Sequence, residues 1–185
     1  PGMTFKEQNL NGLCGLEMLE ACTGKWHAMK VNSISLREYL GLTEQEYDAY
    51  LQTDPGVSFQ ELLDSQRKTQ RFRVYQLDLE HGETRAFAFG GIDALHKAGF
   101  QQPPAAEYTL VYDGELICPV GQDERDILER IFARYNQAFP PDYRGRSIAP
   151  SDVLELYDES ERRYFYCDMA GFLQVKFSPA LAKKA

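Results

Sequence analysis

The sequence predicts an α+β fold, in which short N-terminal helices precede a mostly antiparallel sheet and one long amphipathic helix. Three observations support it: capping-box sequences recur in the first third of the chain, strand-like segments follow, and apolar residues recur at helical spacing over residues 124–138. Strands and helices are interleaved irregularly, which favours α+β over a doubly wound sheet. We expect two parts in the 185-residue chain: an acidic helical segment over residues 3–66 and an α+β domain over residues 70–178.

The first third of the chain contains three sequences in which a hydroxyl residue is followed three positions later by Glu. In such a capping box, the hydroxyl oxygen accepts a hydrogen bond from an amide at the helix start, and the Glu reaches back. The three sequences are Ser35–Glu38, Thr43–Glu46 and Ser58–Glu61. Asp54-Pro55-Gly56 predicts a turn between the last two helices, and the leucines of residues 13–29 predict a further helix that ends near Gly24.

Strand-like sequence begins after a charged joint at residues 67–71. Residues 72–79 are rich in side chains that favour extended structure, and residues 92–98 predict a short helix. Asp113-Gly114 predicts a tight hairpin between two strands within residues 108–120, because Asp-Gly readily adopts the positive φ angles of a two-residue turn.

The strongest helix signal follows Asp123, the expected N-cap, and ends before Pro140-Pro141. Its apolar face consists of Ile127, Leu128, Ile131, Phe132, Tyr135 and Phe139. Three closing strands are predicted at residues 153–157, 163–168 and 173–177. Ala170-Gly171 is expected to form the turn between the last two.

The composition excludes several classes of function. The formal net charge is −8, whereas nonspecific binding to nucleic-acid backbones or anionic lipids requires clustered Lys and Arg. The sequence contains neither an apolar run of about 20 residues nor the basic-then-apolar layout of a signal peptide, so we expect a cytoplasmic protein without a membrane partner. The cysteines form no C-x-x-C pair, and we expect four free, mostly buried thiols at Cys14, Cys22, Cys118 and Cys167.

Motifs typical of catalysis or cofactor binding are absent from the sequence. His27, His81 and His96 each lack a second His or Cys at ligand spacing, and neither a phosphate loop nor a G-x-S-x-G elbow occurs. Gly90-Gly91 predicts a tight turn in preference to an anion site at a helix start. We therefore expect no metal, no cofactor and no catalysis. An enzyme that uses His96 or Cys118 is a third hypothesis, since catalytic partners need only meet in space.

The distribution of charge is more informative. Residues 38–66 contain no Lys or Arg and seven carboxylates: Glu38, Glu44, Glu46, Asp48, Asp54, Glu61 and Asp64. Unpaired charges of one sign repel one another, and a second acidic stretch covers residues 107–129. One interpretation is an ordinary solvated surface, since several of these side chains serve helix starts. The other is a negative surface that binds the nucleic-acid groove of a basic protein.

The loop after the long helix is the other unusual segment. Tyr143, Arg144 and Arg146 follow two prolines and flank a glycine, which predicts a rigid, polar, exposed loop. It is interpreted either as a partner-contacting loop or as one in which the arginines pair with nearby carboxylates and hold it in place.

A family resemblance rests on several segments of the second part: Phe72–Leu77, Tyr112–Gly114, Tyr135-Asn136, Pro141–Val153 and Gly171-Phe172. These resemble the YodL-like domain of Firmicutes over roughly residues 71–178, with most weight on the Gly-x-Ser-x-x-x-Ser-Asp-Val pattern that starts at Gly145. The resemblance implies accessory cargo of conjugative elements, plasmids and phages, without established enzymatic activity. It supplies no catalytic residues.

The size, acidity and implied mobile-element setting are also similar to those of anti-CRISPR proteins that inhibit Cas9. The leading hypothesis is a non-enzymatic inhibitor that binds a Cas9–guide complex and blocks target DNA binding or cleavage. The alternative is an accessory interaction module of a conjugative element or phage without anti-defence activity. Direct nucleic-acid binding through Arg67, Lys68, Arg71 and Arg73 is disfavoured by the net charge, and the oligomeric state stays open.

Overall fold

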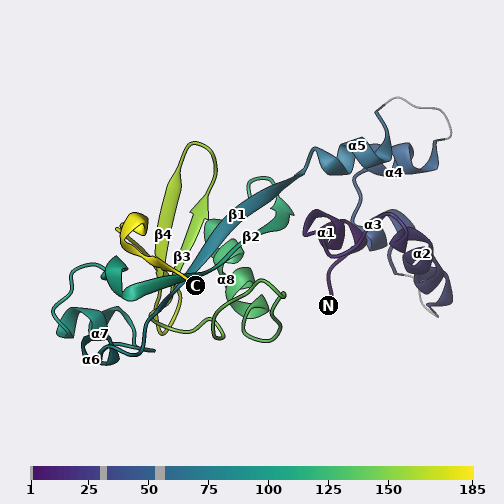
Figure 1. Ribbon diagram of the computed structural model, residues 1–185. Coiled ribbons are helices and arrows are strands. Elements are labelled where there is room, and N and C mark those ends of the chain that lie inside the picture. The colour runs from purple at the N-terminus through teal and green to yellow at the C-terminus, as the bar shows by residue number, and fades with distance from the viewer. Residues whose placement is uncertain (1, 30–32, 53–56) are drawn as a thin grey trace. The chain divides into compact units, whose positions relative to one another are not determined.

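The computed structural model describes residues 2–29, 33–52 and 57–185. The chain divides into two compact units (Figure 1). Unit 1 comprises Pro1–Thr69 and Leu116–Gly121, and unit 2 comprises Gln70–Glu115 and Gln122–Ala185. The turn expected at Asp54-Pro55-Gly56 lies outside the described residues. Within the described ranges, no helix is both long and apolar enough to cross a membrane.

In unit 1, the described residues form five short helices around a small apolar core. They are α1 (Phe5–Leu10), α2 (Met18–Ala28), α3 (Leu36–Leu40), α4 (Glu44–Leu51) and α5 (Phe59–Asp64). Their core side chains are Phe5, Leu19, Leu40, Leu42, Phe59 and Leu63. The helix predicted to end near Gly24 extends to Ala28, because a single helical glycine costs only about 1 kcal/mol.

The predicted helix starts are confirmed. Ser35, Thr43 and Ser58 are the N-caps of α3, α4 and α5, and each hydroxyl accepts a hydrogen bond from the amide three residues later. The reciprocal bond of a full capping box forms at α4, where the Glu46 carboxylate accepts from the Thr43 amide at 2.8 Å. The hydroxyl caps are local interactions, which explains why the sequence alone located them.

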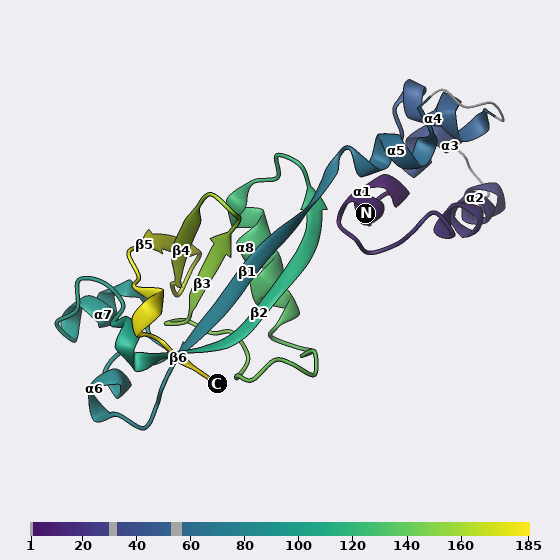
Figure 2. The same ribbon diagram turned by 45° about the horizontal axis from the view of Figure 1, so that its top comes forward.

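The sheet has six strands in the order β5-β4-β3-β1-β2-β6 (Figure 2). The strands are β1 (Arg67–Leu77), β2 (Tyr108–Pro119), β3 (Val153–Tyr157), β4 (Arg162–Cys167), β5 (Phe172–Val175) and β6 (Lys183–Lys184). β3 pairs antiparallel with β1 and β4, and β5 pairs antiparallel with β4, whereas β6 pairs parallel with β2. The α+β fold with a mostly antiparallel sheet is confirmed, and the three closing strands lie within two residues of their predicted bounds. The charged joint at residues 67–71 belongs to β1.

Helices and loops cover the sheet. Helix α8 (Glu124–Arg134) contributes Ile127, Leu128 and Ile131 to the core. A second cluster joins Tyr75, Val153 and Tyr166 of the strands to residues from α7 (Ile92–Lys97), from the segment after α6 (Gly82–Arg85), and from the 3₁₀ helix η1 (Ala105–Glu107). A second 3₁₀ helix, η2 (Pro179–Leu181), precedes β6.

Helix α8 is four residues shorter than predicted. Tyr135 is its C-cap, and the Tyr135 carbonyl accepts a hydrogen bond from the amide of Ile148. The Tyr135 ring stacks on that of Tyr143, with ring centroids 5.6 Å apart. The loop that follows α8 thus folds back on Tyr135, and these contacts accompany the end of the helix before Pro140-Pro141.

The hairpin predicted at Asp113-Gly114 is wrong, since β2 continues through both residues. The Asp113 carboxylate accepts hydrogen bonds from the Arg73 Nε at 3.1 Å and the Tyr157 hydroxyl at 2.5 Å, so tertiary contacts hold it in the strand. A Cβ atom at Gly114 would lie 2.3 Å from the Tyr112 ring. Close packing against that ring therefore explains the glycine without a turn.

Candidate functional site

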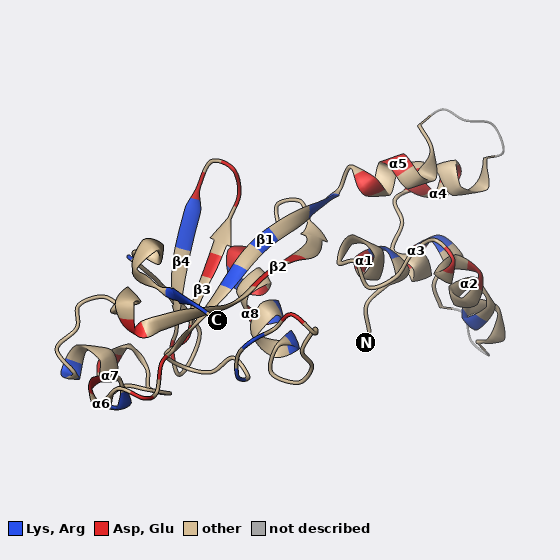
Figure 3. Cartoon of the chain, in the orientation of Figure 1, with Lys and Arg blue, Asp and Glu red and all other residues tan. Residues whose placement is uncertain are grey.

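The acidic side chains predicted to bind a partner lie on α3, α4 and α5. Figure 3 shows acidic residues along α4 and α5. Five carboxylates are exposed and are called here the acidic surface: Glu38, Glu44, Asp48, Glu61 and Asp64. Asp64 forms an ion pair with Arg67 at 2.8 Å. Of the other two predicted carboxylates, Asp54 lies outside the described residues and Glu46 is buried.

Local helix chemistry explains only part of the acidic surface. Glu38, Glu44 and Glu61 lie in the first turns of their helices, where the helix dipole stabilises a negative charge. Asp48 and Asp64 lie in the last turns of α4 and α5, where the dipole disfavours a carboxylate, and neither turn contains a basic residue. For Asp64 the ion pair with Arg67 offsets this cost. The charge of Asp48 has no such local explanation.

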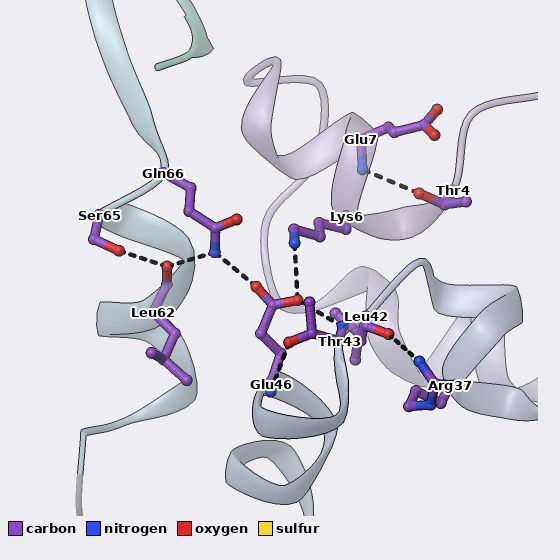
Figure 4. A network of polar contacts seen from close by, with 10 residues as sticks. All are labelled: Thr4, Lys6, Glu7, Arg37, Leu42, Thr43, Glu46, Leu62, Ser65 and Gln66. Atoms are coloured by element: carbon purple, nitrogen blue, oxygen red, sulfur yellow. Dashed lines mark hydrogen bonds and ion pairs between the residues drawn. The ribbon is translucent and has the colours of Figure 1, made fainter. Parts of the chain in front are cut away.

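Glu46 does not belong to the acidic surface, because it is only 4% exposed. Figure 4 shows its carboxylate between three donors. These are the Lys6 ammonium at 2.9 Å, the Thr43 amide at 2.8 Å and the Gln66 side-chain amide at 2.6 Å. Burial raises the pKa of Glu46, but the hydrogen bonds from these donors outweigh it and hold the pKa below the ordinary value. The side chain joins α1, α4 and the residues after α5, which is a structural role.

The predicted residues of the loop after α8 also include both buried and exposed side chains. Tyr143 is buried, and its hydroxyl donates a 2.6 Å hydrogen bond to the Arg146 carbonyl. Arg144 and Arg146 are exposed, although both are fixed through their backbone amides, to the carbonyl of Val111 and the side chain of Gln76. The Arg146 guanidinium donates to the Leu77 carbonyl at 3.0 Å, where the second interpretation expected a carboxylate. The loop is therefore held in place, and of the three predicted residues Arg144 and Arg146 are the exposed ones.

A buried polar pair, Gln76 and Asp152, anchors this loop to the sheet. The Gln76 side-chain amide exchanges hydrogen bonds with the backbone of Arg146 and donates to the Asp152 carboxylate at 3.0 Å. Asp152 also accepts from the Ala149 amide at 3.0 Å. Burial raises the pKa of Asp152 to about 7, although the hydrogen bonds from Ala149 and Gln76 favour the ionised form. Sequence reasoning included both residues only as members of the segments that carry the family resemblance, and it did not predict that they pair.

Two strained residues meet beside this pair. Phe89 and Ser151 have φ angles of 62° and 78°, a region that non-glycine residues rarely adopt. The Phe89 amide donates to the Ser151 hydroxyl at 3.0 Å, and Tyr108 donates its hydroxyl proton to the Ser151 carbonyl at 2.7 Å. Such conformations cost about 1–3 kcal/mol each and cluster at functional sites. The Phe89 ring is 49% exposed, and the Arg146 guanidinium lies 5.7 Å from its centroid.

Gly90-Gly91 does not provide the anion site that sequence analysis considered. The Asp168 carboxylate already accepts from the Ile92 amide at 3.0 Å, at the start of α7. A Cβ atom on Gly91 would lie 2.3 Å from the same carboxylate oxygen. The glycine therefore allows a side chain of this chain to occupy the helix start.

Two of the basic residues of β1 form ion pairs with carboxylates of the same chain. Arg73 pairs with Asp113 and Glu155, both at 3.1 Å, in addition to the Arg67–Asp64 pair. These pairs compete with any phosphate ligand. All four cysteines are free thiols, of which Cys118 and Cys167 are buried while Cys14 and Cys22 are half-buried.

Comparison with known proteins supports one assignment. The family model of the YodL-like domain matches residues 71–177, more than half of the chain. Neither the curated proteins nor the solved structures gave a significant match. The matched range contains the buried Gln76–Asp152 pair, the strained Phe89–Ser151 contact and the loop with Arg144 and Arg146. On this match, the chain belongs to the family of YodL-like domain proteins.

Proposed function

We propose that this protein acts without catalysis, by binding the basic nucleic-acid groove of a defence nuclease, and that the nuclease is of the Cas9 class. The observation that carries the proposal is the acidic surface, in which Asp48 is exposed at a helix C-terminus without a basic residue in its turn. A charge placed where the helix dipole opposes it is consistent with selection for something other than stability.

The chemistry of the partner follows from this charge. A Cas9-type nuclease holds nucleic acid in a positively charged channel and reads the PAM with arginines. Exposed carboxylates on short helices provide negative charges that compete with phosphates for such arginines. The family resemblance to mobile-element cargo supports an anti-defence role. The loop after α8 adds Arg144 and Arg146 as contacts for acidic or carbonyl groups of the partner.

A cleavage assay tests this proposal. The purified protein is added to a Cas9–guide complex either before or after the target DNA, at about tenfold excess to favour saturation. Inhibition only on addition before the DNA is the expected result, because the two ligands would compete for one surface. Inhibition in both orders would argue against competition with DNA.

A matched pair of charge-reversal variants assigns the site. Glu44→Lys with Asp48→Lys is expected to abolish inhibition, since it reverses two charges of the acidic surface. The control, Glu80→Lys with Glu159→Lys, changes the net charge equally at two other exposed residues. If both double variants inhibit equally while circular dichroism shows that they are folded, the acidic surface is not the binding site.

The accessory-module alternative makes a different prediction. The protein would then leave several Cas9 orthologues fully active, and a pull-down from a cell that carries the mobile element would recover another element-encoded protein. The Glu44→Lys, Asp48→Lys variant could fail to capture this protein while the control variant still captures it. That result would show that the acidic surface is the binding site and that its partner is the element-encoded protein and not a nuclease.

A further inference from the structure

Strand β5 forms one edge of the sheet, with β4 on one side and no strand on the other. Its register with β4 indicates which backbone groups point outward. The Asp168 amide donates to the Gly171 carbonyl, and Cys167 lies opposite Phe172. In an antiparallel ladder, hydrogen-bonded and non-hydrogen-bonded pairs alternate, so the amide and carbonyl groups of Phe172 and Gln174 point away from β4. The Lys176 amide, two residues after Gln174, also points away from β4, and it donates a hydrogen bond to the Gln102 side chain.

This edge strand is short, with four residues, but its sequence lacks the charged residues and the proline that often protect an edge strand from pairing. The sequence of β5 is Phe-Leu-Gln-Val, without a charged residue or proline. Leu173 is 41% exposed, and Met169, in the turn before β5, is 70% exposed. An unprotected apolar edge is a template for another extended segment.

Two adjoining hollows lie between this edge and α8. The first, of about 200 Å³, is lined by Glu129, Phe132, Asp168, Met169, Gly171 and Phe172. The second, of about 320 Å³, is lined by Asp123, Glu124, Arg125, Leu128, Phe165, Ala170, Gly171 and Phe172. The Phe132 and Phe172 rings meet edge to face, 6.2 Å apart. Aromatic side chains therefore contribute to the lining of both hollows, beside the outward backbone groups of β5.

The charges around the hollows are mostly negative. Four carboxylates and one arginine line them. Glu124 pairs with Arg163, and Glu129 pairs with Arg125 at 3.1 Å. Asp123 and Asp168 remain without a basic partner among the ion pairs of the described residues, and they accept hydrogen bonds from backbone amides. The hollows are complementary to a segment in which basic residues flank an apolar one.

We infer that the β5 edge and its two hollows bind an extended, basic segment of a protein partner, which adds to the sheet as a seventh strand. The outward groups of Phe172 and Gln174 supply the backbone hydrogen bonds. Alternate side chains of the bound segment face α8, where an apolar side chain enters the hollow and Lys or Arg meets the carboxylates. This goes beyond the proposed function, because the acidic surface contains no residue of β5 or α8.

The test uses two fluorescein-labelled peptides and the full chain. One peptide has Lys two residues before and two residues after a central Phe, with Val between them, so that Lys and Phe share one face of the extended segment. The other peptide has Glu in place of every Lys. Fluorescence anisotropy is expected to show that the basic peptide binds about tenfold more tightly or better. Equal binding of both peptides, or binding of neither, would overturn the inference.

Substitutions at one position separate backbone from side-chain effects. Gln174→Pro removes the outward amide and leaves the hydrogen bonds to β4, so it is expected to weaken the basic peptide about fivefold or more. Gln174→Ala keeps the amide and is expected to remain within about twofold of the parent. Equal affinities of the two variants would exclude strand addition.

A variant on α8 keeps the inference testable if Gln174→Pro does not fold. Glu129→Lys, at an exposed position of α8, is expected to weaken the basic peptide, whereas Glu80→Lys is not. Equal effects of these two variants would refute recognition at the hollows. Sedimentation of the chain alone tests whether a second copy of the chain occupies the β5 edge. A dimer that forms with Gln174→Ala and does not form with Gln174→Pro would assign the edge to a second copy and overturn the inference.

Discussion

The substitution Asp152→Asn tests the electrostatics of the buried pair beneath the family loop. The carboxylate of Asp152 is 2% exposed and accepts hydrogen bonds from Gln76 and Ala149. Asn keeps an acceptor oxygen for both donors and cannot ionise. It therefore resembles the protonated acid, which the folded state prefers because burial penalises the charge.

The magnitude follows from the pKa of Asp152, which burial raises from an ordinary 3.8 to about 7. At about 1.4 kcal/mol per pH unit, this interval corresponds to about 4 kcal/mol of stability. The contribution is fully present below the unfolded-state pKa and is lost as the pH rises through the folded-state pKa. Between about pH 5 and about pH 8, the same relation gives a loss of about 2–3 kcal/mol.

Urea unfolding of the parent and Asp152→Asn proteins at several pH values measures this loss. Trp26, the single tryptophan, lies in unit 1, so the unfolding of unit 2 is followed through amide NMR signals of β3 and β4. Other titrating groups contribute equally to both proteins and cancel in the difference. The unfolding free energy of the variant is expected to rise by about 2–3 kcal/mol relative to that of the parent between about pH 5 and about pH 8. A difference in unfolding free energy that does not change over this range would refute the reasoning.

Two further substitutions test contacts that explain residues of the fold. Gly91→Ala places a methyl group 2.3 Å from the Asp168 carboxylate oxygen and is expected to destabilise unit 2 by about 1–3 kcal/mol in the same NMR assay. Glu46→Ala leaves the Lys6 ammonium, 16% exposed, without its partner. It is expected to destabilise unit 1 by about 1–3 kcal/mol, measured by urea unfolding followed through Trp26 fluorescence.

Each substitution has a matched control of the same chemical type. Nothing lies within 4 Å of a Cβ atom built on Gly82, so Gly82→Ala is expected to change stability by less than about 0.5 kcal/mol. Glu44 is exposed, and Glu44→Ala is likewise expected to be nearly neutral. Equal effects of Gly91→Ala and Gly82→Ala would contradict the close approach of Asp168. Equal effects of Glu46→Ala and Glu44→Ala would contradict the structural role of Glu46.

Features that depend on neighbours in sequence could be predicted from the sequence. Ser35, Thr43 and Ser58 cap helices as expected, because a side-chain oxygen reaches an amide only three residues away. The closing strands also agree, since they are rich in the aromatic and β-branched residues that are enriched in strands. The acidic surface was visible in part for the same reason: a run without Lys or Arg needs no tertiary information.

Burial and long-range pairing were decided only by the tertiary structure. Glu44 and Glu46 lie two residues apart in the same acidic run. The Glu46 carboxylate accepts hydrogen bonds from donors of other elements, whereas Glu44 is exposed to solvent. Asp113-Gly114 has the local signature of a hairpin, but hydrogen bonds from Arg73 and Tyr157 hold Asp113 within a continuous strand. The sequence by itself determined the α+β class, the helix starts and the excess of negative charge. The tertiary structure determined which charges remain exposed, because desolvation and hydrogen bonding depend on groups that only folding brings together.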